Sequence, residues 1–390
     1  MGKNILIAHG GGPTAVINCS LQGAVEAARA SGQVDKIYAA RFGAEGILKG
    51  ELIDLTEVPA ETISRLRDTP ASAIGSCRRK LGEADYPTVL DTLKKFHIDC
   101  FFYNGGNDSM DTCHKVNQLA KREGLDLRVI GIPKTMDNDL VCTDHCPGFG
   151  SAARYAALSA AELALDASAL PIHVVVLELM GRNAGWVTAA SALAARVTDC
   201  EVLTYLPELA VDEDKMLADI QRAYARGKGL LVTVSEGLCG PDGKPLADSG
   251  IVDGFGHTVP GGTAQYISNA IMQKLGLKSR AEKPGLLGRA SIPYVSAVDR
   301  EEAYAVGEYA VNAALAGKSG SMVSIDAQRA PEYRSSLSLV PLEQVANAEK
   351  KFPLEWIVDG NKIADAFFDY ALPLMGGELP QYALLGKTAQ

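Results

Sequence analysis

The sequence predicts a three-layer α/β/α protein with two Rossmann-like domains and mostly parallel sheets. Three observations support this fold class: strand-like runs alternate with helix-like segments, the connections are short, and several runs are apolar along their whole length. Fully apolar strands are typical of parallel sheets that helices cover on both faces. A chain of 390 residues also exceeds the usual size of a single hydrophobic core, which favours two domains.

In the first part of the chain, predicted strands lead through short turns into predicted helices. We expect strands at 4–9, 36–43, 100–104 and 128–132. We expect helices at 14–32, 86–98 and 110–124, because their apolar residues recur at the helical period and several end near a glycine.

The second part continues the same alternation. We expect strands at 172–180, 200–208, 229–237 and 321–325, and helices at 184–195, 211–227, 261–276 and 299–317. From about residue 326 we expect an irregular tail with one helix near 361–372.

Composition excludes several kinds of partner and location. The formal net charge is −9 and the chain has no long basic tract, which argues against nucleic acid or an anionic membrane as the main partner. No apolar stretch approaches the roughly 18 uncharged residues that a membrane-spanning helix needs. The eight cysteines have no framework spacing, so we expect reduced thiols and a cytoplasmic protein.

The first predicted strand runs directly into three glycines, Gly10, Gly11 and Gly12, and then into a helix. Strand, glycine turn and helix N-terminus together form an anion-binding arrangement, because the backbone N–H groups are free to face a phosphate. The sequence matches neither a Walker A loop nor G-x-G-x-x-G, so a tight turn without a ligand remains an alternative.

Two acid-bearing segments, GGNDS at 105–109 and PKTMDND at 133–139, each follow a predicted buried strand. Magnesium-dependent phosphoryl transfer needs a carboxylate base, a site for the metal and cations near the phosphates. Asp137 and Asp139 fit the first two needs, with Lys134 beside them to keep the carboxylates ionised. A turn with Asx-type hydrogen bonds is the alternative interpretation of the D-N-D segment.

Other charged residues also follow predicted strands, where ligands bind in open α/β sheets. Arg182 follows such a strand and Glu236 lies at the end of one, and Arg78, Arg79 and Lys80 lie in a glycine-bounded loop. Three adjacent cations are also common on solvated surfaces, so the loop alone indicates little.

Two further motifs predict nothing. The segment GFGSAA at 148–153 resembles a dinucleotide fingerprint, but no strand precedes it. Cys142, His145 and Cys146 could bind a metal, yet no second ligand pair with zinc spacing exists.

Taken together, these motifs resemble the phosphofructokinase family, and within it the pyrophosphate-dependent members. The resemblance runs from the first strand to about residue 326 and rests on GGGPTAVIN, GAEGILKG, GSCRRKLG, GGNDS, PKTMDND, MGR, SEG, R-A-x-x-x-G and DREEA. It implies a domain for the donor and Mg²⁺ at 1–140, completed by about 300–390. It also implies a sugar-phosphate domain at 141–300.

The resemblance further implies a role for each matching residue. It assigns catalysis to Lys134, Asp137, Asp139 and Arg182, with Asp137 as the base for the sugar 1-hydroxyl. Pyrophosphate contacts fall on Gly11, Arg78, Lys80, Asp108 and Lys134. Fructose 6-phosphate contacts fall on Thr135, Asp137, Met180, Gly181, Arg182, Glu236, Arg280 and Arg289. The metal side chains are Asn107, Asp108 and Asp139.

The choice of donor depends on two positions. ATP-using relatives resemble GGDGS and PGT-x-D-N-D, with glycine where this chain has Asp108 and Lys134. Aspartate adds bulk and negative charge where the α-phosphate of ATP would lie, and lysine adds a cation for pyrophosphate. We therefore expect pyrophosphate as the donor.

Some positions depart from the family pattern. His173 replaces an arginine of bacterial relatives, Gly288 replaces a glutamine before Arg289, and Asn107 replaces a common aspartate. Two alternative functions remain, an ATP-dependent phosphofructokinase and a non-catalytic subunit that binds sugar phosphate. A kinase of the NAD or diacylglycerol type would not explain the presence of both PKTMDND and MGR. Because the role of Arg280 in relatives involves a neighbouring subunit, we expect a homodimer or homotetramer.

Overall fold

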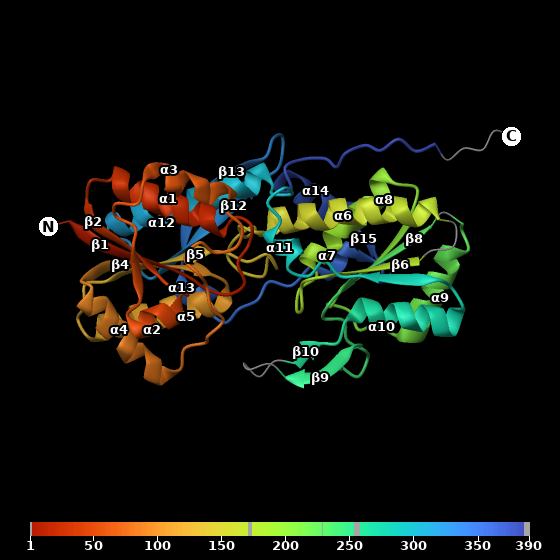
Figure 1. Cartoon of the computed structure of the whole chain (residues 1–390), viewed down its shortest axis with the longest axis horizontal. Helices are drawn as coiled ribbons and strands as arrows, with labels where there is room; N and C mark the ends of the chain where they lie inside the picture. The colour runs from red at the N-terminus through yellow and green to blue at the C-terminus, as the bar shows by residue number, and fades with distance from the viewer. Residues whose placement is uncertain (1, 171–173, 228, 253–257, 386–390) are drawn as a thin grey trace. The chain divides into compact units, whose positions relative to one another are not determined.

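The computed structural model describes residues 2–170, 174–227, 229–252 and 258–385 (Figure 1). The chain folds into two compact units, each made of two stretches of sequence. Unit 1 comprises Met1–Ser151 and Arg289–Lys350, and unit 2 comprises Ala152–Gly288 and Lys351–Gln390. The predicted two-domain α/β architecture is confirmed.

Unit 1 is built on a seven-stranded sheet with the strand order β13-β12-β5-β4-β1-β2-β3. The strands are β1 Lys3–His9, β2 Val34–Ala40, β3 Leu52–Asp54, β4 Ile98–Gly105, β5 Arg128–Pro133, β12 Ser321–Gln328 and β13 Arg334–Pro341. The five inner strands are parallel, whereas the two edge strands β3 and β13 run antiparallel to their neighbours.

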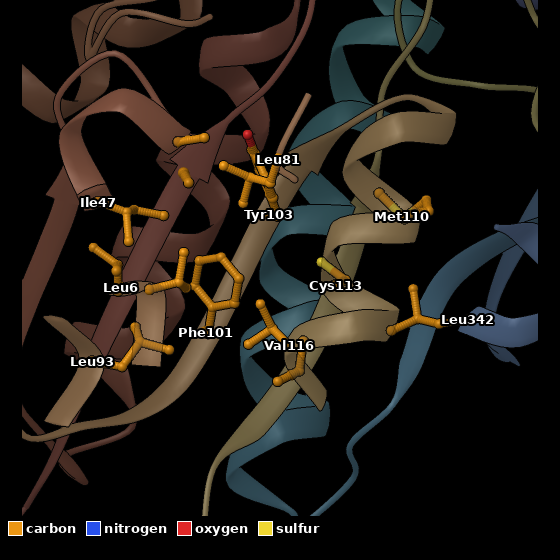
Figure 2. Close-up of a cluster of buried hydrophobic side chains, with 14 of the residues drawn as sticks. Leu6, Ile47, Leu81, Leu93, Phe101, Tyr103, Met110, Cys113, Val116 and Leu342 are labelled. Carbon is orange, nitrogen blue, oxygen red and sulfur yellow. The ribbon is translucent and has the colours of Figure 1, made fainter. Parts of the chain in front are cut away.

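Helices cover both faces of this sheet, as Figure 1 shows. The helices of unit 1 are α1 Ile17–Ala30, α2 Ala44–Lys49, α3 Ala60–Ser64, α4 Tyr86–Lys95, α5 Asn107–Arg122, α12 Ala297–Leu315 and α13 Leu342–Val345, with 3-10 turns η1 Arg65–Asp68 and η2 Glu83–Asp85. Alternate side chains of β1 point to opposite faces of the sheet. Leu6 packs with α2, α4 and α5 (Figure 2), whereas Ile5 and Ile7 pack with α1 and α12. This alternation explains why the strand is apolar throughout.

Unit 2 has a smaller, fully parallel sheet with the order β11-β6-β8-β7. Its strands are β6 Val174–Leu179, β7 Glu201–Tyr205, β8 Leu230–Ser235 and β11 Ser279–Glu282. Its other elements are α6 Phe149–Ala169, α7 Trp186–Ala190, η3 Ser191–Leu193, α8 Ala194–Val197, α9 Glu213–Tyr224, α10 Thr263–Ala270, the π-helical turn η4 Ile271–Leu275, α11 Leu287–Ala290, η5 Leu354–Trp356, α14 Asp365–Leu374 and the ribbons β9 Asp248–Val252 with β10 Thr258–Pro260 and β14 Ile357–Val358 with β15 Lys362–Ile363. The helices α6 and α11 each begin in one unit and end in the other.

The expectation of an irregular tail is wrong for the segment up to 341, whereas the helix expected near 361–372 is confirmed by α14. β12 continues to Gln328, and β13 pairs with it over eight residues from Arg334 to Pro341. The segment 334–341 is rich in serine and leucine, and on an edge strand such a segment needs only one pairing neighbour and little burial.

The last forty residues also group differently from the expected donor domain, because 351–390 belong to unit 2. An aromatic cluster explains this grouping. The ring of Trp186 lies 5.2 Å from that of Phe352, 6.0 Å from that of Trp356 and 6.5 Å from that of Phe367, measured between centroids. Aromatic pairs at these separations add to the stabilisation that burial provides.

Two further sequence expectations concern membrane spans and His173. Among the residues that the structure describes, no helix is long and apolar enough to cross a membrane. His173, the departure noted beside the predicted strand at 172–180, lies outside the described residues.

Candidate active site

Three loops that follow β1, β4 and β5 lie at the same edge of the unit 1 sheet, because these strands are parallel neighbours. The loop after β5 is tied to the loop after β4, since the Lys134 N–H donates to the Gly105 carbonyl at 3.1 Å. It is tied to the glycine loop after β1 as well, since the Lys134 ammonium donates to the Gly12 carbonyl at 2.8 Å. The structure thus brings PKTMDND, GGNDS and the glycine loop together.

Cations gather around the glycine loop. A Cβ at Gly12 would lie 2.3 Å from Nη1 of Arg289 and 3.4 Å from Nη2 of Arg78, so both guanidinium groups lie close to the backbone of this glycine. A Cβ at Gly11 would lie 3.3 Å from the Lys134 ammonium. The N–H groups of Gly10 and Gly11 donate to the Asn104 and Cys77 carbonyls, both at 2.9 Å, so the three positive side chains rather than these amides provide the charge that a phosphate anion needs.

Burial strongly affects Lys134, whose side chain is only 3% exposed. Desolvation lowers the pKa of this lysine to about 8, with Arg289 and Arg78 acting in the same direction. Asp137 and Asp139 partly offset the effect. The lysine therefore stays mostly cationic at neutral pH but close to its titration.

The remaining cations of the glycine-bounded loop point to different partners. The Lys80 ammonium lies 3.3 Å from a carboxylate oxygen of Asp108, and both side chains are exposed. Arg79 forms ion pairs with Glu45 and Asp85 at 3.2 and 2.9 Å. Lys80 thus forms a solvent-facing pair with Asp108, which lies on the first turn of α5.

The loop that carries the two acids has a special backbone. Asn138 lies between Asp137 and Asp139 with a φ of 53°, in the left-handed region, and its side chain is fully buried. Its Oδ1 accepts the Cys146 N–H at 3.1 Å. The Asp137 N–H donates to the Thr135 hydroxyl at 3.1 Å. Both carboxylates are only partly exposed, consistent with a base and a metal ligand in one loop.

Two of the three predicted metal side chains approach each other. Asn107 Nδ2 lies 3.5 Å from Asp139 Oδ2. Asn107 Oδ1 and Asp139 Oδ1 are buried and accept no hydrogen bond from the described part of the chain. Oxygen atoms without a partner fit Mg²⁺, which takes one or two protein ligands and completes its shell with phosphate and water. Asp108, the third predicted ligand, is directed to Lys80 instead.

Within unit 2, the predicted sugar residues follow neighbouring strands β6 and β8. The Glu236 N–H donates to the Leu179 carbonyl at 3.0 Å, which places Glu236 beside Met180. The Ser235 hydroxyl donates to the Gly181 carbonyl. A Cβ at Gly237 would lie 1.8 Å from the Arg182 carbonyl oxygen, so only glycine permits this approach of the two loops.

A cavity of about 240 Å³ lies at the ends of these strands, and its lining includes two charged residues, Glu178 and Lys283, that the motif analysis did not identify. It is lined by Glu178, Leu179, Met180, Glu236, Lys283, Gly285 and Leu286. The Lys283 ammonium lies 2.5 Å from a carboxylate oxygen of Glu178, whose side chain is 1% exposed. Glu178 also accepts the Ala264 N–H at 3.0 Å. A charged residue inside an otherwise apolar strand is the sequence signal that could have identified Glu178.

Arg280 lies on β11 and is exposed. The segment that departs from the family pattern after it is also exposed, with Leu286 and Leu287 each 63% exposed. Arg289 belongs to unit 1 and lies against Gly12, on the side of the predicted donor residues. Its predicted contact with the sugar 6-phosphate stays a prediction.

The two histidines near the site are both buried. His9, at the end of β1, is fully buried, and desolvation with the nearby Lys134 lowers its pKa to about 3, so it is neutral. Both ring nitrogens of His145 face carboxylates, Asp144 at 2.8 Å and Glu302 at 2.6 Å, and these partners raise its pKa.

Comparison with known proteins finds similarity over most of the chain. The model of the family described as Phosphofructokinase matches residues 4–314. The chain is 42% identical, over an alignment of 406 positions, to a pyrophosphate--fructose 6-phosphate 1-phosphotransferase of Methylococcus capsulatus. The alignment covers 99% of this chain and 97% of the relative. It is 34% identical to a sulfofructose kinase of Alkalicoccus urumqiensis, covering 95% and 96% of the two chains.

A solved structure is similar over nearly the whole chain. The crystal structure of a pyrophosphate-dependent phosphofructokinase from Marinobacter aquaeolei superposes with a TM-score of 0.86 at 39% identity, covering 97% of this chain and 92% of that one.

Proposed function

The chain belongs to the phosphofructokinase family, and we propose that it transfers a phosphoryl group reversibly from pyrophosphate to the 1-hydroxyl of fructose 6-phosphate. The products are fructose 1,6-bisphosphate and phosphate. One observation carries the choice of donor: the buried ammonium of Lys134 lies on the Gly12 carbonyl beside the guanidinium groups of Arg78 and Arg289. This cluster supplies the positive charge that a small, highly charged donor needs.

Asp108 supports the same choice by opposing ATP. Its carboxylate lies on the first turn of α5 and is 75% exposed, next to the Lys80 ammonium. A carboxylate at the position that we assign to the α-phosphate repels a nucleotide by charge and excludes it by volume. Pyrophosphate has no third phosphate and so avoids this position.

In the reaction, Asp137 accepts the proton of the sugar 1-hydroxyl as the oxygen attacks the nearer phosphorus of pyrophosphate. The bond from that phosphorus to the bridging oxygen breaks, and phosphate leaves with the electron pair. Lys134 stabilises the charge that develops on the leaving phosphate, because a preorganised cation in a buried site acts most strongly. Arg78 and Arg289 hold the donor in line for attack.

Mg²⁺ is part of the proposal. We assign Asn107 and Asp139 as its protein ligands, because each has a buried oxygen atom that accepts no hydrogen bond from the described residues. When bound, the ion would neutralise the phosphate oxygens and polarise the transferring phosphorus.

We assign recognition of the sugar to residues of unit 2. Glu236 accepts hydrogen bonds from sugar hydroxyls, and Met180, Gly181 and Arg182 contact the sugar and the transferring group. Arg280 binds the 6-phosphate of the sugar that a neighbouring subunit holds. We therefore propose a homodimer or homotetramer. We further propose a cytoplasmic location, since all eight cysteines are free thiols.

A donor competition assay tests the proposal. Purified enzyme is given fructose 6-phosphate and Mg²⁺ with either pyrophosphate or ATP, and fructose 1,6-bisphosphate is measured by a coupled assay. We expect rapid formation with pyrophosphate, the reverse reaction with added phosphate, and little product with ATP. Faster turnover with ATP than with pyrophosphate contradicts the donor assignment.

A further inference from the structure

A lysine late in the chain holds the loop that carries Asp137 and Asp139. Lys350 is the last residue of unit 1 and lies beyond the stretch that the family model matches. Its backbone N–H donates to the Asp139 carbonyl at 2.7 Å. Its ammonium donates to the Asp144 carbonyl at 2.8 Å and to the Thr143 carbonyl at 3.3 Å. One residue thus contacts both ends of the segment 139–144.

The Lys350 ammonium also contacts Asn138, the residue between Asp137 and Asp139. It lies 3.4 Å from Oδ1 of Asn138, the oxygen that also accepts the Cys146 N–H. A residue with a positive φ persists only when its surroundings determine it, and Asn138 has a φ of 53°. Because Asn138 separates Asp137 from Asp139, its backbone angles set the directions of both carboxylates.

The ammonium is well matched to this task. It has three N–H donors, and three oxygen atoms of the loop lie within hydrogen-bonding distance. The segment before it is anchored, since Leu342 and Val345 of α13 are fully buried in the core on the α5 side of the sheet. Lys350 therefore extends from a fixed base into the loop.

We propose that Lys350 is a positioning residue for the reaction, holding the 137–146 loop so that Asp137 meets the sugar hydroxyl in line with the donor. The kinetic part of this inference rests on the proposed function, in which Asp137 is the base. Misplacing a reacting group by about 1 Å can cost on the order of 100-fold in rate, so loss of this support should be visible in kcat.

Hydrogen exchange tests the positioning role without any turnover. In Lys350→Met, we expect faster exchange at the amides of Asp144 and Cys146, which bond to the Ile325 carbonyl and to Asn138 Oδ1. Exchange within the inner strands of the sheet should not change. Lys351→Met is the matched control, because its exposed ammonium donates to the Asn183 carbonyl in unit 2.

Kinetics with the same variants supply the second measurement. We expect Lys350→Met to lower kcat by roughly 10- to 100-fold with less than a threefold change in either KM, while Lys351→Met keeps the parent kcat. Lys350→Arg, which keeps the charge and the donors, should retain more of kcat than the methionine variant. If Lys350→Met yields no folded protein, Lys350→Gln is measured in the same way.

Three outcomes would overturn the proposal: unchanged exchange in the loop, a kcat within twofold of the parent, or an equal loss in Lys351→Met. Faster exchange throughout unit 1 with an unchanged kcat per folded enzyme would also overturn it, since that result indicates a merely structural role. If the parent enzyme does not use pyrophosphate, the proposed function fails, but the exchange experiment still decides whether Lys350 holds the loop.

Discussion

The Lys134 ammonium donates a hydrogen bond of 2.8 Å to the carbonyl of Gly12, across 122 residues of sequence. This bond joins the loop with the two acids to the glycine loop, and it fixes a buried cation where the donor is expected. Because a carbonyl oxygen rather than a carboxylate accepts the bond, the charge of Lys134 remains available to an incoming anion.

The titration of Lys134 should govern donor binding at high pH. Desolvation lowers its pKa to about 8, so the ammonium loses its proton as the pH rises through that value. The cation is therefore present below about pH 8 and absent above it. We expect kcat/KM for pyrophosphate, which reports the free enzyme, to fall above about pH 8.

A non-titrating variant separates this effect from the ionisation of pyrophosphate itself. Lys134→Met should have a low kcat/KM that shows no fall centred near pH 8. If the fall persists unchanged in this variant, it comes from the donor or from another group.

Asp108→Gly should relax the selection of donor. Removal of the exposed carboxylate eliminates repulsion of the α-phosphate, so we expect kcat/KM for ATP to rise by about tenfold or more, since each 1.4 kcal/mol is a factor of ten. Pyrophosphate activity should persist, because Lys134, Arg78 and Arg289 remain. The measurement is the ratio of the two kcat/KM values, with exposed Asp126 changed to glycine as the control. An unchanged ratio would remove Asp108 from the donor argument.

Much of this site could be predicted from sequence because its residues follow strands of one parallel sheet. Gly11, Lys134 and Asp137 lie in loops that follow apolar runs, and adjacent parallel strands bring the ends of these runs together. Asp108 shows the limit of such reasoning: its position after β4 is as predicted, but its side chain pairs with Lys80 and leaves Asn107 to face Asp139. The direction in which a side chain points within a turn depends on tertiary packing, and the spacing of residues in the sequence does not determine that packing.

Contacts over long distances in sequence could not be predicted in the same way. Lys350 has no motif around it, and only the fold brings it to Asn138. Lys283 lies between the two arginines of a recognised motif, but its partner Glu178 is inside a strand. The final segment was assigned to the wrong neighbours because Phe367 packs on Trp186, a tertiary contact that no local pattern predicts.

Lys283 should contribute to binding of the sugar phosphate. Its ammonium lines the cavity shared by Met180 and Glu236 and is held by buried Glu178. A hydrogen bond to a charged group contributes about 1.5–3 kcal/mol, so Lys283→Met should raise KM for fructose 6-phosphate by roughly 10- to 100-fold. KM for pyrophosphate should stay within threefold.

Lys278→Met provides the matched control, since Lys278 is exposed just before β11. Equal effects of the two substitutions on the sugar KM would contradict a specific role for Lys283. The same pair of variants can be compared with sedoheptulose 7-phosphate to learn whether the cavity limits the length of the sugar.

The aromatic cluster of unit 2 should dominate the stability of the C-terminal segment. Phe367 is fully buried, so Phe367→Ala should lower the free energy of unfolding by about 3–5 kcal/mol. Urea unfolding followed by tryptophan fluorescence is a direct measure, because both tryptophans of the chain belong to this cluster. Leu385→Ala, at a side chain that is 96% exposed, should change stability by less than about 0.5 kcal/mol. A smaller loss for Phe367→Ala than for Leu385→Ala would refute the packing argument.

Asp137→Asn tests the base most directly. The amide keeps the size of the side chain but cannot accept the hydroxyl proton, and general base catalysis contributes about 100- to 10,000-fold. We expect kcat to fall within that range while fructose 6-phosphate still binds, as measured by calorimetry. Asp126→Asn, an exposed carboxylate paired with Arg128, should leave kcat unchanged. A kcat within threefold of the parent would mean that another group takes the proton. A loss of sugar binding equal to the loss of kcat would instead make Asp137 a binding residue, because only an interaction specific to the transition state lowers kcat with binding intact.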